Sequence, residues 1–434
     1  MIRRFVNLVL EEYYGSRKYS LHRLDVAKYL FYPSTAQAEA ANAKESNNGG
    51  GGVGDKPNAP KPPRIKRLRR LPEPSMRFSP FPPADDGEDK RYRGSSFNDD
   101  TFILLSPGSS EGRILHATEG GRTVVYDADA DAVSATASSF PARMERWPIA
   151  FSVPGAGGFM EEKESLYVMR STIRPPPPPK YNHYDPAPKE QDPCSGDFVV
   201  LDFNKPFEWQ RLPRPPFVPD GDRPGSGSYS DIRIGSSTVV DGGRTICVSV
   251  SPSFNVERTY CFDTATRQWR HAGDWALPFY GRAEYVPELG TWIGLSSSPP
   301  HHLCASDLAA AMDAHRAPTL QHVWDDFTPP PDKDSSIVLN RRFPLYVLSR
   351  WTEWSLLGVS LVNLGSGRFC ILKVFNISRS ESVGFSSYDS WSEEKEFTVL
   401  TGVEVVRCHD GEGGLRMVKH KSRRCEFGSN HWLL

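Results

Sequence analysis

Residues 259–278 read TYCFDTATRQWRHAGDWALP, and this stretch decides the prediction of the fold. The aromatic and β-branched start TYCF is typical of a β-strand, and Asp263 stands where that strand should end. An Asp at such a place can accept hydrogen bonds from backbone N–H groups two or three residues on, which stabilises a turn into the next strand. Trp269 follows, and its large ring can cover the apolar gap between adjacent sheets. The stretch therefore predicts a structural hairpin rather than an active site.

A strand closed by Asp or Asn occurs six times along the chain. The closing residues are Asp25, Asp127, Asp202, Asp263, Asp307 and Asn376. The spacing from Asp263 to Asp307 falls in the range of about 40–50 residues that is typical of kelch and WD40 blades. Trp209 in FEWQRLPRPP repeats the order of Trp and Leu-Pro seen around Trp269. Recurrence of this kind predicts a radial repeat.

The expected fold class is all-β, a β-propeller of six blades that mostly contain four antiparallel strands. A propeller must close its ring, and an open sheet edge invites aggregation, so strands from both chain ends should share one blade. RRFVNLVLE and YSLHRLD at one end would pair with EFTVLTGVEVVR and GLRMVKHK at the other. The expected segments are 1–35 for the N-terminal strands that close the propeller, 36–95 for a disordered insert, 96–428 for the propeller body with a Pro-rich loop at 172–196, and 429–434 for a tail.

Composition argues against several classes of protein. With 52 basic and 53 acidic residues, the formal charge of −1 gives no global attraction to nucleic acid or to an anionic membrane. The seven cysteines show no CxxC and no pairing rhythm, as expected for free thiols in a reducing compartment. The N-terminus lacks the features of a secretory signal, and no apolar stretch approaches the roughly 18 residues of a membrane span. We therefore expect a soluble protein in the cytoplasm, the nucleus or both, with no membrane contact.

Residues 36–63 carry almost no large apolar side chains, which predicts disorder because burial cannot offset the entropy of ordering. The run RIKRLRR follows, with positive charges at Arg64, Lys66, Arg67, Arg69 and Arg70. Such a run inside a flexible segment suits the groove of a nuclear import receptor, and the alternative is a flank that only aids solubility. Nucleic-acid binding is not expected, because the protein as a whole is nearly neutral.

Seven segments of the chain resemble one known family. They are YSLHRLDVAKYLFYPS, GRTVVYDADA, GDWALPFYGRAEYVPELGTWIGL, LCASDL, LGSGRFCI, FTVLTGVEVVR and LRMVKHKSRR, within residues 1–35 and about 97–425. The chain resembles a large, mainly cereal-grass family of plant proteins that is defined by a domain of unknown function, with some members described as kelch-like. The resemblance implies a kelch-like β-propeller. It implies no activity, ligand or catalytic residue, because none is established for the family.

No metal and no cofactor is expected. His301, His302 and Cys304 lie close together, and alternation in a strand would put His302 and Cys304 on the same side. We interpret His302 as a loop-end residue and Cys304 as a core residue. Asp325 and Asp326 are adjacent and so point apart, which predicts solvated turn residues. The HExxH pattern is absent from the sequence, and no catalytic residues are predicted.

These observations favour a non-enzymatic propeller that acts as a protein-interaction module for an unidentified protein partner. The loops expected to form its recognition surface are 172–196, 221–230 and 329–340. One alternative is a small-ligand-binding or enzymatic propeller in which Arg282, Glu284 and Tyr285 line the central channel, although these side chains could instead pack between blades. A second alternative is a substrate adaptor of a ubiquitin ligase without a recognisable F-box.

Overall fold

The computed structural model describes residues 2–14, 16–47, 65–79, 100–105, 111–118, 121–135, 140, 146–153, 165–173, 194–202, 208–218, 231–250, 257–313, 316–327, 336–339, 347–383, 390–408, 414–427 and 430–434. This part of the chain is mainly β. The helices within it are α1 (Val26–Tyr29), α2 (Thr35–Asn47), α3 (Leu308–Asp313) and the 3-10 turn η2 (Asp241–Gly243).

The strands form six units, and strands named next to each other within a unit are hydrogen-bonded neighbours. All these pairings are antiparallel except that of β26 with β3, which is parallel. Unit 1 contains β27 (His431–Leu433), β1 (Phe5–Tyr14), β2 (Ser16–Asp25) and β4 (Met76–Phe78). Unit 2 contains β5 (Thr101–Leu104), β6 (Arg113–Ala117), β7 (Thr123–Asp127) and β8 (Ala132–Ala135). Unit 3 contains β9 (Ile149–Val153), β10 (Ser165–Met169), β12 (Cys194–Asp202) and β13 (Glu208–Pro213).

Unit 4 contains β14 (Ile232–Val240), β15 (Thr245–Val250), β16 (Arg258–Asp263) and β17 (Gln268–Gly273), and β11 (Thr172–Ile173) pairs with β14. Unit 5 contains β18 (Phe279–Val286), β19 (Thr291–Ser296), β20 (Leu303–Ser306) and β21 (His322–Trp324). Unit 6 contains β22 (Ser336–Leu339), β23 (Val347–Gly365), β24 (Arg368–Val383), β25 (Ser390–Arg407), β26 (Leu415–Cys425) and β3 (Lys66–Arg67). Units 4 and 5 share a sheet through a short parallel pairing of β14 with β18, in which Ser236 and Ser237 lie opposite Gly281 and Arg282.

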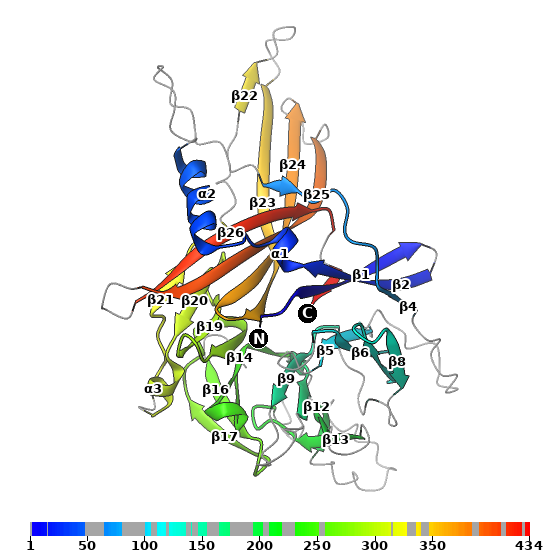
Figure 1. Cartoon of the computed structure of the whole chain (residues 1–434), viewed down its shortest axis with the longest axis vertical. Helices are drawn as coiled ribbons and strands as arrows, with labels where there is room; N and C mark the ends of the chain where they lie inside the picture. The colour runs from blue at the N-terminus through cyan, green and yellow to red at the C-terminus, as the bar shows by residue number, and fades with distance from the viewer. Residues whose placement is uncertain are drawn as a thin grey trace, which may run out of the picture.

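Six hydrophobic clusters join neighbouring units and complete a circuit. The clusters contain Tyr19 with Phe102 for units 1 and 2, Leu115 with Leu166 for units 2 and 3, Phe198 with Phe262 for units 3 and 4, Cys247 with Phe279 for units 4 and 5, Leu295 with Phe369 for units 5 and 6, and Leu24 with Leu372 for units 6 and 1. Figure 1 shows the units following one another around a common centre, with both chain ends beside it. This radial arrangement is that of a β-propeller.

The strand that closes the circuit differs from the predicted one. β1 pairs with β27, where Leu8 lies opposite Leu433, so the residues expected to form a tail contain the closing strand. The prediction that β1 would share a sheet with β25 and β26 was wrong. β25 is hydrogen-bonded to β24 on one side and to β26 on the other, so it has no free edge for β1. Val6 and Leu8 instead pack in one cluster with Leu400 of β25.

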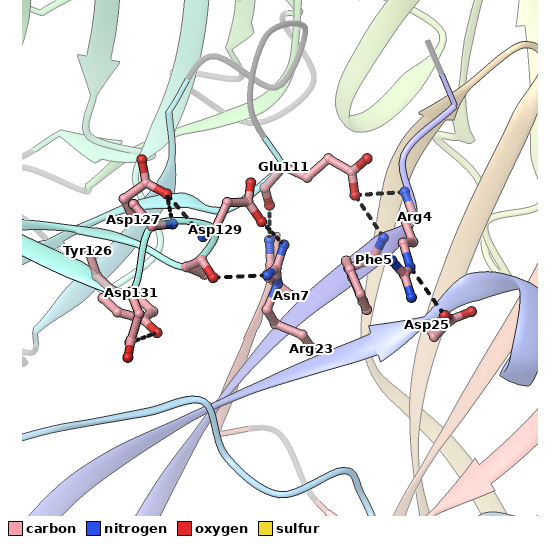
Figure 2. A network of polar contacts seen from close by, with 12 residues as sticks. Arg4, Phe5, Asn7, Arg23, Asp25, Glu111, Tyr126, Asp127, Asp129 and Asp131 are labelled. Atoms are coloured by element: carbon pink, nitrogen blue, oxygen red, sulfur yellow. Dashed lines mark hydrogen bonds and ion pairs between the residues drawn. The ribbon is translucent and has the colours of Figure 1, made fainter.

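A polar network fastens unit 1 to unit 2 (Figure 2). The Glu111 carboxylate accepts hydrogen bonds from the backbone N–H groups of Arg4 (2.6 Å) and Phe5 (2.9 Å). The Arg23 guanidinium donates to the Asp129 carboxylate at 2.8 Å and lies over the ring of Phe5. These contacts hold the start of β1 and the end of β2 against the segment before β6 and the turn after β7.

Most of the predicted closing residues lie at the end of a strand, as expected, or directly after one. They are Asp25, Asp127, Asp202, Asp263 and Asp307. The Asp263 carboxylate accepts hydrogen bonds from the N–H groups of Ala265 (2.9 Å) and Thr266 (2.8 Å), and Asp127 and Asp307 make the same two kinds of contact. Asp25 accepts one from Lys28, three residues on, and so caps α1. Asn376 departs from the prediction, because it lies inside β24 of unit 6.

The two tryptophans of the repeat lie between units. Trp269 packs with Phe198 across the boundary of units 3 and 4, and its indole N–H donates to the carbonyl oxygen of Pro213 at 3.1 Å. Trp209 packs between units 2 and 3, with its ring centroid 4.3 Å from that of Phe140. These rings cover the gaps between sheets.

The expected disordered insert, 36–95, contains ordered elements. α2 lies on unit 6, with Ala38 fully buried and the Asn42 side-chain amide donating to the carbonyl oxygen of Lys419 at 2.8 Å. β3 and β4 also fall inside this range. The segment lacks large apolar residues, but its alanines have high helix propensity, and a small side chain lets the helix approach the sheet closely. The rest of the insert, 48–64 and 80–95, lies outside the described residues.

Unit 6 is larger than the other units. β23, β24 and β25 have 19, 16 and 18 residues, and their far ends project beyond the circuit of sheets (Figure 1). At the start of this projection, Trp354 packs edge-on against Phe375 and Phe397. The near ends of the same strands pack against units 1 and 5.

Candidate functional site

A cavity of about 500 Å³ lies where the six units meet. Every unit contributes to its wall: the strands are β5, β9 and β10, β14, β18, β23 and the closing strand β27. The volume falls within the range of roughly 300–1,000 Å³ that is usual for small-molecule sites. The cavity is therefore the central channel of the radial arrangement, and it is the strongest candidate for a functional site in the described part of the chain.

The described wall is mostly apolar with a few polar groups. Its apolar side chains include Phe102, Ile103, Leu104, Trp147, Ile149, Leu166, Ile234, Leu361, Val362 and Leu433. Its charged side chains are those of Arg3, Arg233, Arg282 and Glu284. Ser152, Ser171, Ser236, Ser237 and Asn363 add neutral polar groups. An apolar wall with a small number of polar groups is typical of a site that binds and orients an organic molecule.

A bulge in β18 positions two of the charged side chains. The pairing of β18 with β19 shifts its register between Tyr280 and Glu284, and Gly281 has a φ of 67°, which favours glycine. Arg282 and Glu284 form an ion pair at 3.2 Å on the cavity side. The Arg282 guanidinium also donates to the carbonyl oxygen of Ala150 at 2.7 Å, so it reaches from unit 5 to unit 3.

Tyr285 was predicted to line the channel with Arg282 and Glu284, but it is not part of the cavity wall. Successive residues of a strand point to opposite faces, so Tyr285 points away from the side that Glu284 occupies. Its ring packs against Trp292 at 4.6 Å and its side chain remains 46% exposed.

Arg3 is a wall residue that sequence reasoning missed. It is 6% exposed, and its guanidinium donates to the carbonyl oxygens of Leu434 (3.0 Å) and Asn363 (3.5 Å). Its Nε is buried without a hydrogen-bond partner in the described structure. Burial lowers the pKa of the Arg3 guanidinium, and the negative charges of Glu284 and Glu111 raise it by less. No local pattern distinguishes Arg3 in the sequence, because its partners lie more than 350 residues away.

Gly235 is a second wall residue that was missed, and here the sequence did contain a signal. A glycine inside a strand pattern often marks a bulge or a close approach, and the register of β14 with β15 shifts between Ile234 and Ser236. A Cβ atom at Gly235 would meet no atom within 4 Å. The space beside it is therefore open to the cavity.

A second polar cluster lies between units 5 and 6. Atoms of His302, Asp325 and Asp326 that could ligate a metal ion lie within 4.8 Å of one another. The prediction that Asp326 is a solvated turn residue was wrong, because it is buried and its carboxylate accepts a hydrogen bond from the buried Lys373 ammonium at 2.8 Å. The Lys373 ammonium therefore already supplies a positive charge beside Asp326. Cys304, which the sequence places close to His302, lies instead in the core between units 4 and 5.

The basic run is partly ordered. Lys66 and Arg67 form β3, which pairs with Arg423 and Arg424 of β26, so these two residues are not in a flexible segment as predicted. Arg69 and Arg70 are exposed, and Arg64 lies outside the described residues. Of the predicted recognition loops, 221–230 lies outside the described residues entirely. In 172–196 and 329–340 the structure describes only short strand segments.

None of the described helices is both long and apolar enough to cross a membrane.

A family model matches residues 3–425, which is nearly the whole chain. Its description is a protein of unknown function, DUF1668. The chain belongs to the DUF1668 family. Membership in the DUF1668 family identifies no site residues, so the cavity is argued to be a site from its geometry alone. No curated protein matches the sequence.

Several solved structures are similar to this DUF1668 protein at low identity. The extracellular domain of the putative hybrid two component system BT3049 from B. thetaiotaomicron is 11% identical, and the match covers 76% of this chain and 38% of that one, with a TM-score of 0.25. BamB from Moraxella catarrhalis is 12% identical over 71% and 82% of the two chains, with a TM-score of 0.24. The periplasmic gluconolactonase PpgL of Pseudomonas aeruginosa is 9% identical over 76% and 96%, with a TM-score of 0.29. At these TM-scores the likenesses carry no argument about fold or activity.

Proposed function

We propose that this DUF1668 protein is a six-bladed β-propeller that binds a small molecule in its central cavity without transforming it. In this proposal, units 1 to 6 are the six blades, and the protein is related to kelch-like plant proteins. The observation that carries the proposal is the cavity wall, to which a strand of every unit contributes. A ligand at this place would contact all six units at once and would leave most of its surface buried.

The composition of the wall favours binding over catalysis. In the described part of the chain it contains no His, Cys, Asp or Lys, the residue types that often serve as bases or nucleophiles. Its carboxylate belongs to Glu284, which is held in an ion pair with Arg282. A proton transfer or covalent step would need a second reactive group beside it. The enzymatic alternative therefore has less support than the binding alternative.

Two glycines allow a matched test of the cavity. A Cβ atom at Gly235, in the wall, and one at Gly358, in β23 but outside the wall, would both meet no atom within 4 Å. A leucine at either position can therefore be added without a clash at Cβ, but only Gly235→Leu places its side chain beside the cavity. Both variants should fold, which circular dichroism and thermal unfolding will show.

The measurement is ligand-observed NMR of a fragment library with wild type and both variants. We expect fragments that bind wild type and Gly358→Leu but lose saturation transfer with Gly235→Leu. If the two variants retain the same fragments, or if wild type retains none at millimolar concentration, the proposal is wrong.

A second candidate function is docking of a protein partner on the projecting part of unit 6. β23, β24 and β25 extend beyond the circuit (Figure 1). Leu357, three residues after Trp354 in β23 and so next to the start of the projection, is 46% exposed. Leu357→Asp should reduce recovery of a partner from native extract, whereas Val323→Asp, a change at a similarly exposed residue of β21, should not. Equal recovery with both variants would contradict docking at this surface. A ubiquitin-ligase adaptor would be a special case of this candidate.

We also propose an intracellular location, in the cytoplasm or the nucleus. The support is that all the cysteines whose side chains the structure describes are free thiols, as is usual in a reducing compartment. Imaging of a tagged full-length chain would test it, and secretion into the medium would contradict it.

A further inference from the structure

Two aromatic rings are exposed in the wall of the central cavity. Trp147 is 50% exposed and Tyr280 is 41% exposed, whereas many other apolar side chains of the wall are at most 8% exposed: Phe102, Ile103, Leu166, Ile234 and Val362. The third large aromatic side chain that is exposed in the described structure, Tyr285, lies outside the wall. The apolar surface that a ligand can reach in the cavity is therefore to a large part aromatic.

Each of these two rings has one face covered by another side chain. The Arg146 guanidinium lies over the Trp147 ring, 5.0 Å from its centroid, and the indole N–H donates to the carbonyl oxygen of His431 at 3.1 Å. The Tyr280 ring is stacked on that of His301, with the centroids 4.1 Å apart. These contacts hold both rings in place, so the exposed area of each lies on its other side. A ring that is already held loses little entropy when a flat apolar surface binds to it.

Tyr280 lies next to open space. Ser236 pairs with Gly281, so the residues before them, Gly235 and Tyr280, are neighbours on adjacent strands. A Cβ atom at Gly235 would meet no atom within 4 Å. Arg233 is exposed on the same side of β14 as Gly235, because burial alternates along this part of the strand. The space beside the Tyr280 ring therefore has a strong hydrogen-bond donor close to it.

The polar groups of the wall match a ligand with several hydroxyl groups. Arg282 and Glu284 form their ion pair at 3.2 Å with side chains that are 37% and 35% exposed, so donors and an acceptor lie side by side within reach of a ligand. Ser152 and Ser236 also belong to the wall, and their hydroxyl groups form no hydrogen bond with the described residues. A serine hydroxyl can both donate and accept.

We propose that the cavity binds a neutral sugar in its pyranose form, with one face of the sugar ring on Tyr280 and beside Gly235. The sugar hydroxyl groups would bond to Arg233, Arg282 and Glu284. This inference rests on the proposed function, since it names the class of ligand for the same cavity. A pyranose has apolar C–H groups on the faces of its ring and hydroxyl groups around the edge, so it satisfies the aromatic and the polar groups together. A purely apolar ligand would leave the polar groups without partners, which is costly.

Rings of the same size with and without the sugar hydroxyl groups provide the test. The probes are methyl β-D-glucopyranoside, methyl β-D-galactopyranoside, methyl β-D-xylopyranoside and cyclohexanol, titrated into the full chain. Isothermal titration gives the affinities, and saturation-transfer NMR shows which ligand hydrogens contact the protein. For at least one glycoside we expect binding about tenfold tighter than that of cyclohexanol. Its axial hydrogens on one face of the ring should receive the strongest saturation, because that face lies on the aromatic ring.

Two tyrosines of β18 supply matched variants. Tyr280→Leu should weaken the preferred glycoside about tenfold and remove the difference in saturation between its two faces, because leucine is apolar but has no flat face. Tyr285→Leu changes a similarly exposed ring outside the wall and should leave both unchanged.

Two arginines supply a second matched pair. Arg233→Gln should weaken the glycoside but not cyclohexanol, and Arg77→Gln, at an exposed arginine of β4, should change neither. Thermal unfolding shows whether each variant folds. If Tyr280→Leu does not fold, the wild-type affinities and the saturation of the two faces still decide the question.

The outcomes separate this inference from the proposed function. If cyclohexanol binds as tightly as every glycoside and Gly235→Leu blocks it, the cavity is a ligand site but the sugar class is wrong. If a glycoside is preferred but Tyr280→Leu and Tyr285→Leu bind it equally well, its placement on Tyr280 is wrong. If library fragments bind in the cavity but no glycoside does so at millimolar concentration, the inference alone fails. If neither fragments nor glycosides bind, the proposed function fails with it.

Discussion

Units 4 and 5 meet at a boundary that the chain crosses directly, whereas unit 1 is assembled from both ends of the chain. β17 ends at Gly273 and β18 begins at Phe279, so only a short connection separates the two neighbouring units. In unit 1, the Asn7 N–H donates to the carbonyl oxygen of Leu434 at 3.1 Å, and the Leu434 N–H donates back to that of Asn7 at 2.9 Å. These residues stand more than 400 positions apart in the sequence.

Both boundaries contain a buried tryptophan with the same kind of hydrogen bond. Across units 4 and 5, the indole N–H of Trp292 donates to the carbonyl oxygen of Val239 at 3.1 Å. Beside unit 1, the indole N–H of Trp432 donates to the carbonyl oxygen of Arg146 at 2.9 Å. Unit 1 has further polar contacts: Glu111 accepts from the Arg4 N–H, and Arg23 donates to Asp129. In the chain that follows α1, the Tyr32 N–H donates to His420 of unit 6. Contacts between distant segments must offset a larger loss of chain entropy than contacts between segments that follow each other directly.

The largest effect expected comes from the matched pair Trp432→Ala and Trp292→Ala. Each should lower the free energy of unfolding by about 3–5 kcal/mol, because each removes a large buried ring and leaves a carbonyl oxygen without its donor. Trp432→Ala should in addition expose the amides of β1 to hydrogen exchange, since it weakens the closing strand, and Trp292→Ala should leave β1 protected. Urea unfolding and hydrogen-exchange mass spectrometry measure both effects. Equal loss of protection at β1 in the two variants would show that the closing strand does not open independently of the rest of the protein.

Glu111→Ala should have the second-largest effect. The Glu111 carboxylate accepts hydrogen bonds from two backbone N–H groups, and loss of hydrogen bonds to a charged group costs about 1.5–3 kcal/mol. Glu208→Ala, at an exposed position of β13, is the control and should change stability by less than about 0.5 kcal/mol. Thermal unfolding of the two variants decides the matter, and the same melting temperature in both would mean that Glu111 does not stabilise the closure.

The contact made by His420 should make stability depend on pH. Burial lowers the pKa of His420 from its ordinary value of 6.5, and the ring nitrogen Nδ1 accepts a hydrogen bond from the Tyr32 N–H, which requires the neutral form. Because the unfolded chain binds the proton more readily, the stability that this residue contributes is present above pH 6.5 and decreases as the pH falls below it. His420→Gln should flatten the dependence of melting temperature on pH below that value. Parallel curves for wild type and His420→Gln would refute this account.

The smallest effect belongs to the ion pair between Arg23 and Asp129. The Asp129 side chain is 56% exposed, so water screens the pair, and Asp129→Asn should cost no more than about 1 kcal/mol. The cost should decrease further in about 1 M salt. A larger loss, measured by urea unfolding at both salt concentrations, would mean that this pair contributes to closure as much as Glu111 does.

The sequence predicted the elements that depend on local chemistry. The aspartates that follow the strands stabilise turns through N–H groups two or three residues on, as Asp263 does, and such contacts can be inferred from a few adjacent residues. The order of strands and the need for closure by both chain ends could also be inferred. Asn376 shows the limit of the pattern, because a strand that continues past an Asn is not visible in a short window.

The candidate site could be predicted only in part. Arg282 and Glu284 lie in the cavity wall, and alternation along the strand could have excluded Tyr285. Arg3 could not have been placed there, because its contacts depend on residues near the other end of the chain. Asp326 was predicted to be solvated because Asp325 stands next to it in the sequence. Its carboxylate is instead buried against Lys373 of another unit, which the sequence around Asp326 does not reveal.

By itself the sequence determined that this DUF1668 protein is built from short strands and Asp-stabilised turns, because those features depend on propensities and hydrogen bonds within a few residues. Only the tertiary structure decided that His431–Leu433 closes the circuit, that α2 lies on unit 6 and that Arg3 is buried at the cavity. The physical reason is that each of these depends on which distant groups remain unpaired once the six units pack together, and no local pattern encodes that.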